Sequence, residues 1–187
     1  MGLSRSNDSK RQEGAIRKMR FSRKNRCRWQ YDQLHGIDFD QTFTPVSRHT
    51  FVRILLTIAA ARYLPLQQID VENEFLDALI DAIFFMEQPH TYGEGDSRIC
   101  QLKKSLYGIK HAPRLWKQHL HKIQLDIGSK QLPHDPVMYR LHFYGDYILL
   151  TVYVDDLLYT GTSNTSLDLL KRNLSQRVDI TTNRNVT

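Results

Sequence analysis

Cysteine is scarce in this chain, with only Cys27 and Cys100 among its 187 residues. Two cysteines can pair at most once, so the sequence lacks the disulfide framework on which many small secreted domains depend. Long apolar runs are missing as well, because the longest, near residues 54–61 and 147–154, fall far short of the roughly 20 residues of a membrane helix. We therefore expect an intracellular protein, cytoplasmic or nuclear, with no membrane partner.

Several signatures of catalytic and nucleotide-binding sites are also missing. The sequence has no P-loop and no dinucleotide-binding glycine pattern, since Gly93-Glu94-Gly95 lacks the third glycine. It has no Gly-x-Ser-x-Gly nucleophile elbow. His119 and His121 are two residues apart on an expected helix and so point to different faces, which is not a zinc-binding arrangement. These absences leave little support for a P-loop nucleotide hydrolase, a dinucleotide-dependent oxidoreductase, a serine hydrolase or a zinc enzyme.

Positive charge is concentrated near the N-terminus. Residues 1–30 contain ten Lys and Arg against Asp8 and Glu13, whereas the whole chain carries a net charge of +6. Because residues 1–32 include few apolar side chains, we expect them to form a basic arm that is disordered on its own. Such an arm binds phosphate backbones, acts as a nuclear import signal, or is a solvated tail without a partner.

Residues 147–159 form the most apolar and β-branched stretch, interrupted only by the adjacent acids Asp155 and Asp156. This pattern predicts two buried strands with the acids where the chain turns back. Adjacent carboxylates repel one another and lose solvation on burial, and a bound cation would relieve both costs. Magnesium prefers such oxygen ligands. The alternative is a plain polar turn, since Asp tolerates tight hairpins.

A second extended segment, residues 64–71, also carries an aspartate, Asp70, near its end. A third carboxylate from a separate strand would complete a site for two divalent ions, which clamp the attacking and leaving oxygens of phosphoryl transfer. The three acids therefore favour a phosphoryl-transfer site over a polar turn. A two-metal nuclease would use similar carboxylates, and it is the nearest rival enzyme on these residues alone.

Further sequence blocks occur in a definite order along the chain. They are residues 36–43 with Pro45-Val46, 68–71 with Phe75-Leu76, 86–89, 102–110 with 112–114 and Trp116, Asp135-Pro136 with Tyr139, and 153–156. In this order the blocks resemble the reverse transcriptase domain of copia-type retrotransposon Pol polyproteins, from about Gln33 to about Val178. So many ordered blocks make the resemblance specific and argue against the nuclease.

The hydrophobic pattern predicts an α+β fold with a mostly antiparallel sheet packed against helices. We expect helices over 50–62, 112–127 and 164–177, and strands over 65–71, 137–143, 147–153 and 157–160. The resemblance implies a polymerase palm with partial fingers, truncated, over residues 33–180, followed by a tail at 181–187. It also implies that thumb and RNase H domains are absent from this chain.

The resemblance assigns site residues one by one. Asp70, Asp155 and Asp156 match the catalytic acids, and with Val71 they would form the metal site for two Mg2+ ions, or Mn2+ in their place. The predicted nucleotide-binding residues are Val71, Phe75, Tyr107, Gly108 and Lys110. Phe75 would exclude a 2′-hydroxyl from the sugar pocket, while an ordinary core position is its alternative. For Tyr107, Gly108 and Lys110 the alternative is a plain loop before a helix.

Three residues depart from the family's pattern. Glu74 replaces a small alanine beside Phe75, where its charge would oppose a triphosphate. Ala78 replaces a glycine, which would cost about 1 kcal/mol or more if the position needs positive φ. His111 stands where glutamine is usual. Residues 23–27 are basic but not strand-like, so the expected contacts of the fingers with triphosphate lack support.

Two functional hypotheses follow. The first is an RNA-directed DNA polymerase that uses an RNA template, a DNA primer and deoxynucleoside triphosphates, together with other parts of a Pol polyprotein. The second is a catalytically inactive retrotransposon remnant that acts at most as a nucleic-acid-binding module. The surviving acids favour the first, and the missing thumb favours the second.

Overall fold

The computed structural model describes residue 42 and residues 49–87, 99–143 and 145–183, together with the backbone of two short strands, β1 (Arg20–Arg23) and β2 (Arg28–Trp29). Most of the basic arm and of the block at 36–46 lies outside these residues. The chain divides into two compact units, one of Met1–Phe43 with Phe75–Trp116 and one of Thr44–Glu74 with Lys117–Thr187.

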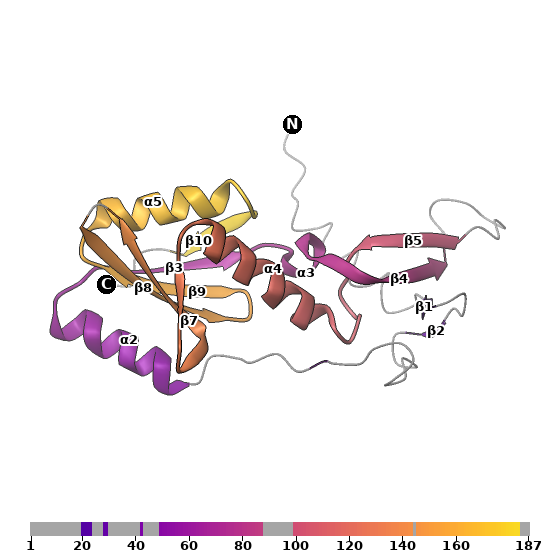
Figure 1. Ribbon diagram of the computed structural model, residues 1–187, viewed down its shortest axis with the longest axis horizontal. Helices are drawn as coiled ribbons and strands as arrows, with labels where there is room; N and C mark the ends of the chain where they lie inside the picture. The colour runs from indigo at the N-terminus through magenta and orange to yellow at the C-terminus, as the bar shows by residue number, and fades with distance from the viewer. Residues whose placement is uncertain are drawn as a thin grey trace. The chain divides into compact units, whose positions relative to one another are not determined.

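The second unit is built on a six-stranded sheet in the order β10-β3-β9-β8-β7-β6, in which every neighbouring pair is antiparallel (Figure 1). Its strands are β3 (Leu66–Val71), β6 (Lys130–Leu132), β7 (Asp135–Phe143), β8 (Asp146–Tyr153), β9 (Asp156–Gly161) and β10 (Ile180–Asn183). The four strands expected from the hydrophobic pattern are confirmed. β6 and β10 were not predicted, and β10 includes residues 181–183, which we expected in the tail.

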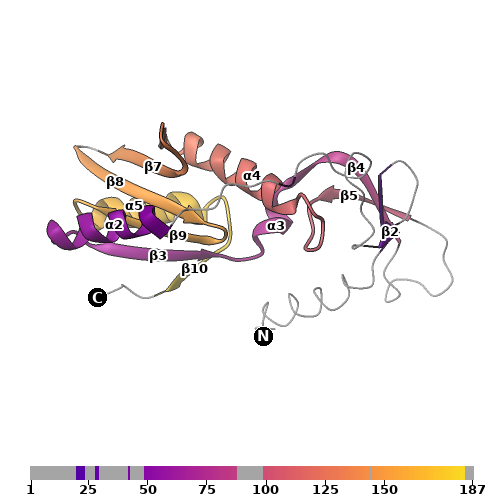
Figure 2. The same cartoon turned by 90° about the horizontal axis from the view of Figure 1, so that it is seen from below.

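Helices α2 (His49–Ala61) and α5 (Asn164–Ser175) both pack on the central strands β8 and β9. The two views agree that they cover opposite sides of the sheet (Figures 1 and 2). The predicted leucine stripe of α5 is confirmed, since Leu167, Leu170 and Leu174 are at most 1% exposed. Because side chains alternate along a strand, these leucines pack against the side chains on one face of β8 and β9.

Local signals also fix where α5 begins. The hydroxyl of Ser163 accepts a hydrogen bond from the backbone N–H of Ser166 at 3.2 Å, which caps the helix. Asp146 at the start of β8 accepts hydrogen bonds from the hydroxyls of Thr162, Ser163 and Ser166. These bonds, with that from Ser166 the largest contribution, lower the pKa of Asp146. The cap therefore ties the helix to the strand beneath it.

The first unit contains a four-stranded antiparallel sheet in the order β2-β1-β4-β5, with β4 (Leu79–Glu87) and β5 (Ile99–Lys104) as its longer strands. The one-turn helix α3 (Glu74–Asp77) precedes β4. Helix α4 (Ala112–Asp126), of which residues 112–116 belong to this unit, begins where the sequence predicts it, with Leu115 and Trp116 buried. None of these four strands was predicted, and β1 and β2 lie within residues 1–32, which we expected to be disordered.

The predicted α+β class with mostly antiparallel sheets is confirmed by these elements. Its finer reading as a palm with partial fingers stays a prediction, as do the boundaries at residues 33 and 180. In the part of the chain that the structure describes, we find no helix with the length and apolar character to cross a membrane.

Candidate active site

The β8–β9 hairpin displays the predicted acids at its tip. Tyr153 pairs with Asp156, so that Val154 and Asp155 form a two-residue turn. Val154 has φ of 58°, a left-handed conformation that a β-branched residue rarely adopts. The backbone N–H of Val71 donates to the carbonyl of Asp155 at 3.1 Å, which ties the turn to β3. The prediction that both acids lie where the chain turns back is confirmed.

Strand pairing brings the third acid to the same place. Asp70 on β3 lies directly opposite Asp156 on β9 in the antiparallel register. Residues directly opposite one another project their side chains from the same face of a sheet. Asp155 precedes Asp156 in the turn, so the acids predicted from two distant segments lie at one end of two neighbouring strands. Asp70, Asp155 and Asp156 are all half-buried.

The pKa of Asp70 reflects how close the other acids lie. Burial raises the pKa of Asp70, and the negative charges of Asp155, Asp156 and Glu72 raise it further, in that order. Asp70 therefore holds its proton more tightly than an isolated aspartate, and the gathering of negative charge around it favours a bound cation.

Glu72 is a fourth acid that the sequence reasoning missed. Its backbone N–H donates to the carbonyl of Asp179 at 2.9 Å, and its carboxylate accepts a hydrogen bond from the Thr181 hydroxyl. Strand β10 therefore holds Glu72 next to the cluster. The only signal in the sequence was its position two residues after Asp70; Glu72 itself lies in the turn that follows β3.

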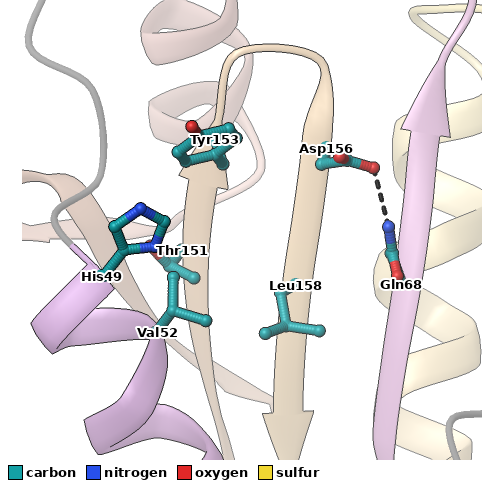
Figure 3. A pocket seen from close by; sticks show the side chains of 7 residues that line it. All are labelled: His49, Val52, Gln68, Thr151, Tyr153, Asp156 and Leu158. Carbon is teal, nitrogen blue, oxygen red and sulfur yellow. Dashed lines mark hydrogen bonds between the residues drawn. The ribbon is translucent and has the colours of Figure 1, made fainter.

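A cavity of about 270 Å³ lies beside Asp156, between α2 and the sheet (Figure 3). Its lining residues come from four elements: His49, Val52, Gln68, Thr151, Tyr153, Asp156 and Leu158. The rings of His49 and Tyr153 have centroids 6.3 Å apart at one side of the cavity. On the other side, the Gln68 Nε2 donates to Asp156 Oδ1 at 2.8 Å. One oxygen of this carboxylate therefore already has a protein partner.

The carboxylates of Asp70, Asp155 and Asp156 suit a hard divalent cation, because such a cation prefers oxygen ligands. Its positive charge would also offset the repulsion among the three carboxylates. Among the residues that the structure describes, no three His, Cys, Asp or Glu side chains are arranged as a ready-made metal site. The three acids therefore have the chemistry of cation ligands, but their side chains are not arranged as a complete coordination site. Val71 is buried and contributes its N–H to the turn; its role in binding metal or nucleotide stays a prediction.

The other predicted nucleotide-binding residues lie in the first unit. Phe75 on α3 and Tyr107 after β5 meet edge to face, with ring centroids 4.9 Å apart. Both are half-buried and pack against a small core of Met86, Ile109 and Ala112. This packing agrees with the core alternative for Phe75 and leaves its role as a sugar gate a prediction.

The loop before α4 carries the other two predicted contacts. Gly108 has φ of 98°, a conformation that glycine adopts without strain. Lys110 is exposed. The structure therefore places Tyr107, Gly108 and Lys110 in the short loop before a helix, and their contact with a template or nucleotide stays a prediction.

The structure corrects one expectation about the departures from the family's pattern. Ala78 does not have positive φ and is fully buried, so the condition for a conformational cost of replacing glycine is not met. The left-handed residue lies instead at Asn73, with φ of 56°, and asparagine tolerates this conformation. Glu74 is only 7% exposed, and its predicted effect on a triphosphate stays untested. His111 is buried against the ring of Phe84, with centroids 5.1 Å apart.

The chain is similar to a known protein family over most of its length. The model of the family "Reverse transcriptase (RNA-dependent DNA polymerase)" matches residues 9–186. The chain is 38% identical over 152 residues to the retrovirus-related Pol polyprotein from transposon RE1 of Arabidopsis thaliana, and 36% identical over 152 residues to that from transposon RE2. It is 35% identical over 153 residues to the Pol polyprotein from transposon TNT 1-94 of Nicotiana tabacum.

Each of these matches covers 80% of the chain, but only 10% of the RE1 and RE2 polyproteins and 12% of the TNT 1-94 polyprotein. The chain thus spans about a tenth of the length of these relatives. The match over nearly the whole chain confirms the resemblance carried by the ordered blocks. The chain belongs to the reverse transcriptase family, in the form found in the Pol polyproteins of copia-type transposons.

Proposed function

We propose that this chain forms the polymerase centre of an RNA-directed DNA polymerase. The observation that carries the proposal is the register of β3 and β9, which sets Asp70 opposite Asp156 beside the strained turn at Val154. A strained turn persists only where the surrounding structure holds it, and such strain is concentrated at functional sites. Here the strained residue lies directly before two acids.

In the proposed reaction, a primer 3′-hydroxyl attacks the α-phosphorus of a deoxynucleoside triphosphate. A bond forms between the 3′-oxygen and phosphorus, the bond to pyrophosphate breaks, and the hydroxyl proton goes to solvent. Asp70, Asp155 and Asp156 would hold the divalent cations, with Val71 beside them. Two Mg2+ ions, when bound, would neutralise the charge that develops on the phosphoryl oxygens.

The carboxylates of this chain do two things for that chemistry. They concentrate negative charge at the ends of neighbouring strands, as the raised pKa of Asp70 indicates, and so attract cations. They are also fixed by strand pairing and by the N–H of Val71 on the Asp155 carbonyl. Ligands on a rigid scaffold lose little entropy when an ion binds.

The proposed roles of the first unit concern the incoming nucleotide. Phe75 would lie against the sugar and exclude a 2′-hydroxyl, and its edge-to-face contact with Tyr107 would hold the ring in place. Lys110 is exposed and would meet a phosphate. In this reading the two units correspond to a palm and part of the fingers, and the template is RNA within a Pol polyprotein.

The test is primer extension on an RNA template with the purified chain, deoxynucleotides and Mg2+. Asp155→Asn should abolish extension. The matched control Asp126→Asn should not, because Asp126 is exposed at the end of α4. Glu74→Ala should raise the rate if the Glu74 charge opposes the triphosphate.

Extension that survives in Asp155→Asn would refute the proposed site. Lack of extension in every variant, with binding of labelled nucleic acid retained, would support the alternative function of an inactive remnant that binds nucleic acid.

A further inference from the structure

Gln68 makes a direct contact with one of the predicted catalytic acids. Its Nε2 donates to Asp156 Oδ1 at 2.8 Å, across the boundary between β3 and β9 (Figure 3). In the strand register Gln68 lies opposite Leu158, and Asp70 lies opposite Asp156. The hydrogen bond therefore runs diagonally across one face of the sheet, a span that a long side chain bridges.

The chemistry of this donor suits a metal-binding carboxylate. A carboxylate has two oxygens, and Gln68 engages Oδ1, which leaves Oδ2 available for another partner. The amide is neutral, so it fixes the orientation of Asp156 without cancelling the charge that attracts a cation. A lysine or arginine at this position would compete with the cation for the same carboxylate.

Asp156 needs such an anchor because its neighbours repel it. Asp70 lies directly opposite and Asp155 is adjacent in sequence, so a free Asp156 side chain would turn away from both. The bond to Gln68 holds the carboxylate at the wall of the cavity, where both residues are half-buried. Partners of this kind orient metal ligands, and their loss typically weakens metal affinity by about 10- to 100-fold.

The neighbouring residue offers a matched comparison. Gln67 precedes Gln68 on the same strand and projects to the opposite face, where its Oε1 accepts a hydrogen bond from the Tyr159 hydroxyl at 2.8 Å. The two glutamines therefore have the same side chain, the same strand and similar burial. Only Gln68 contacts an acid of the cluster.

We propose that Gln68 is a positioning residue for Asp156, which presents the free oxygen of that carboxylate to a divalent cation. This inference rests on the proposed function, since it gives Asp156 a partner within the same metal site. Replacing Gln68 should weaken cation binding, although the residue itself need not touch the ion.

The experiment measures Mn2+ affinity of the purified chain by electron paramagnetic resonance, which detects the loss of free Mn2+. Gln68→Leu and Gln68→Met should each weaken binding about 10-fold. Gln67→Leu should lower the melting temperature but leave the affinity unchanged. The double variant Gln68→Leu/Asp156→Asn should bind as Asp156→Asn alone does, because the two residues act through one contact.

Different failures have different meanings. Unchanged affinity in both Gln68 variants, or an equal loss in Gln67→Leu, would overturn the positioning role and leave the proposed metal site intact. Additive losses in the double variant would also overturn it. Absence of Mn2+ binding by the natural chain would overturn the proposed function, and the role of Gln68 with it.

Discussion

Replacing Asp70 by asparagine should stabilise the cation-free protein while removing its metal site. Asp70 faces Asp156 across the strand pair, and burial followed by the charges of Asp155, Asp156 and Glu72 raises its pKa. Each of these effects disfavours the ionised carboxylate in the folded state. Asparagine has nearly the same shape without the charge, so Asp70→Asn removes the repulsion and leaves the packing in place.

The strand geometry sets the size of the effect. Opposite residues in an antiparallel pair have Cβ atoms about 5 Å apart, and two unit charges at that distance repel by about 0.8 kcal/mol in water and about 3 kcal/mol at an effective dielectric constant of 20. Asp70 and Asp156 are half-buried, so solvent screening keeps the gain near the lower value. We expect a free energy of unfolding about 1 kcal/mol higher, which raises the melting temperature by about 2–4 °C in a chain of this size.

The pH dependence has a definite sign. A carboxyl with a raised pKa in the folded state takes up a proton more readily when folded than when unfolded, so its destabilising effect fades as pH falls. The advantage of Asp70→Asn should therefore be present near pH 7 and disappear in acid, where the natural Asp70 is neutral.

Thermal unfolding in a metal chelator at several pH values, with Asp126→Asn as the control, measures this difference. Added Mn2+ should then stabilise the natural chain and not Asp70→Asn. A lower melting temperature of Asp70→Asn at pH 7, or a gain that persists unchanged in acid, would show that repulsion at Asp70 does not destabilise the folded chain.

Two further changes test the hairpin and the core by urea unfolding. Val154→Gly should change the free energy of unfolding by less than about 1 kcal/mol, because relief of about 1–3 kcal/mol of backbone strain offsets the loss of the side chain. The control Val152→Gly, in the buried part of β8, should lower the free energy of unfolding by about 3 kcal/mol. Equal losses in the two variants would argue against strain at Val154. Tyr159→Phe should cost about 1–2 kcal/mol, since it leaves the Gln67 Oε1 without its donor. Because burial raises the pKa of Tyr159 above its ordinary value, the natural chain should also lose stability above about pH 10 more steeply than Tyr159→Phe; parallel losses would contradict this.

The parts of the fold that the sequence predicted are those fixed by local pattern. Helix α5 carries leucines at 167, 170 and 174, a helical spacing that needs no knowledge of the partner. The β8–β9 hairpin was predicted because two apolar runs flank one polar pair. β10 carries a single apolar side chain in Ile180–Asn183 and forms because β3 offers it an edge. Pairing of that kind joins distant segments, so short windows of sequence do not contain it.

Dependence on distant strand pairing also separates the site residues that were predicted from those that were not. The three acids could be named because each ends or interrupts an apolar segment and because the ordered blocks match a family. The structure brings them together through the register of β3 and β9. Gln68 and Asp70 are two residues apart on β3, so both project from one face, whereas Glu72 lies in the turn after the strand. The hydrogen-bond partners of Gln68 and Glu72 come from two other strands. The spacing of residues along β3 therefore predicts contacts across the site only when the register of the neighbouring strands is known. A one-residue slip of β3 would turn these side chains to the opposite face of the sheet.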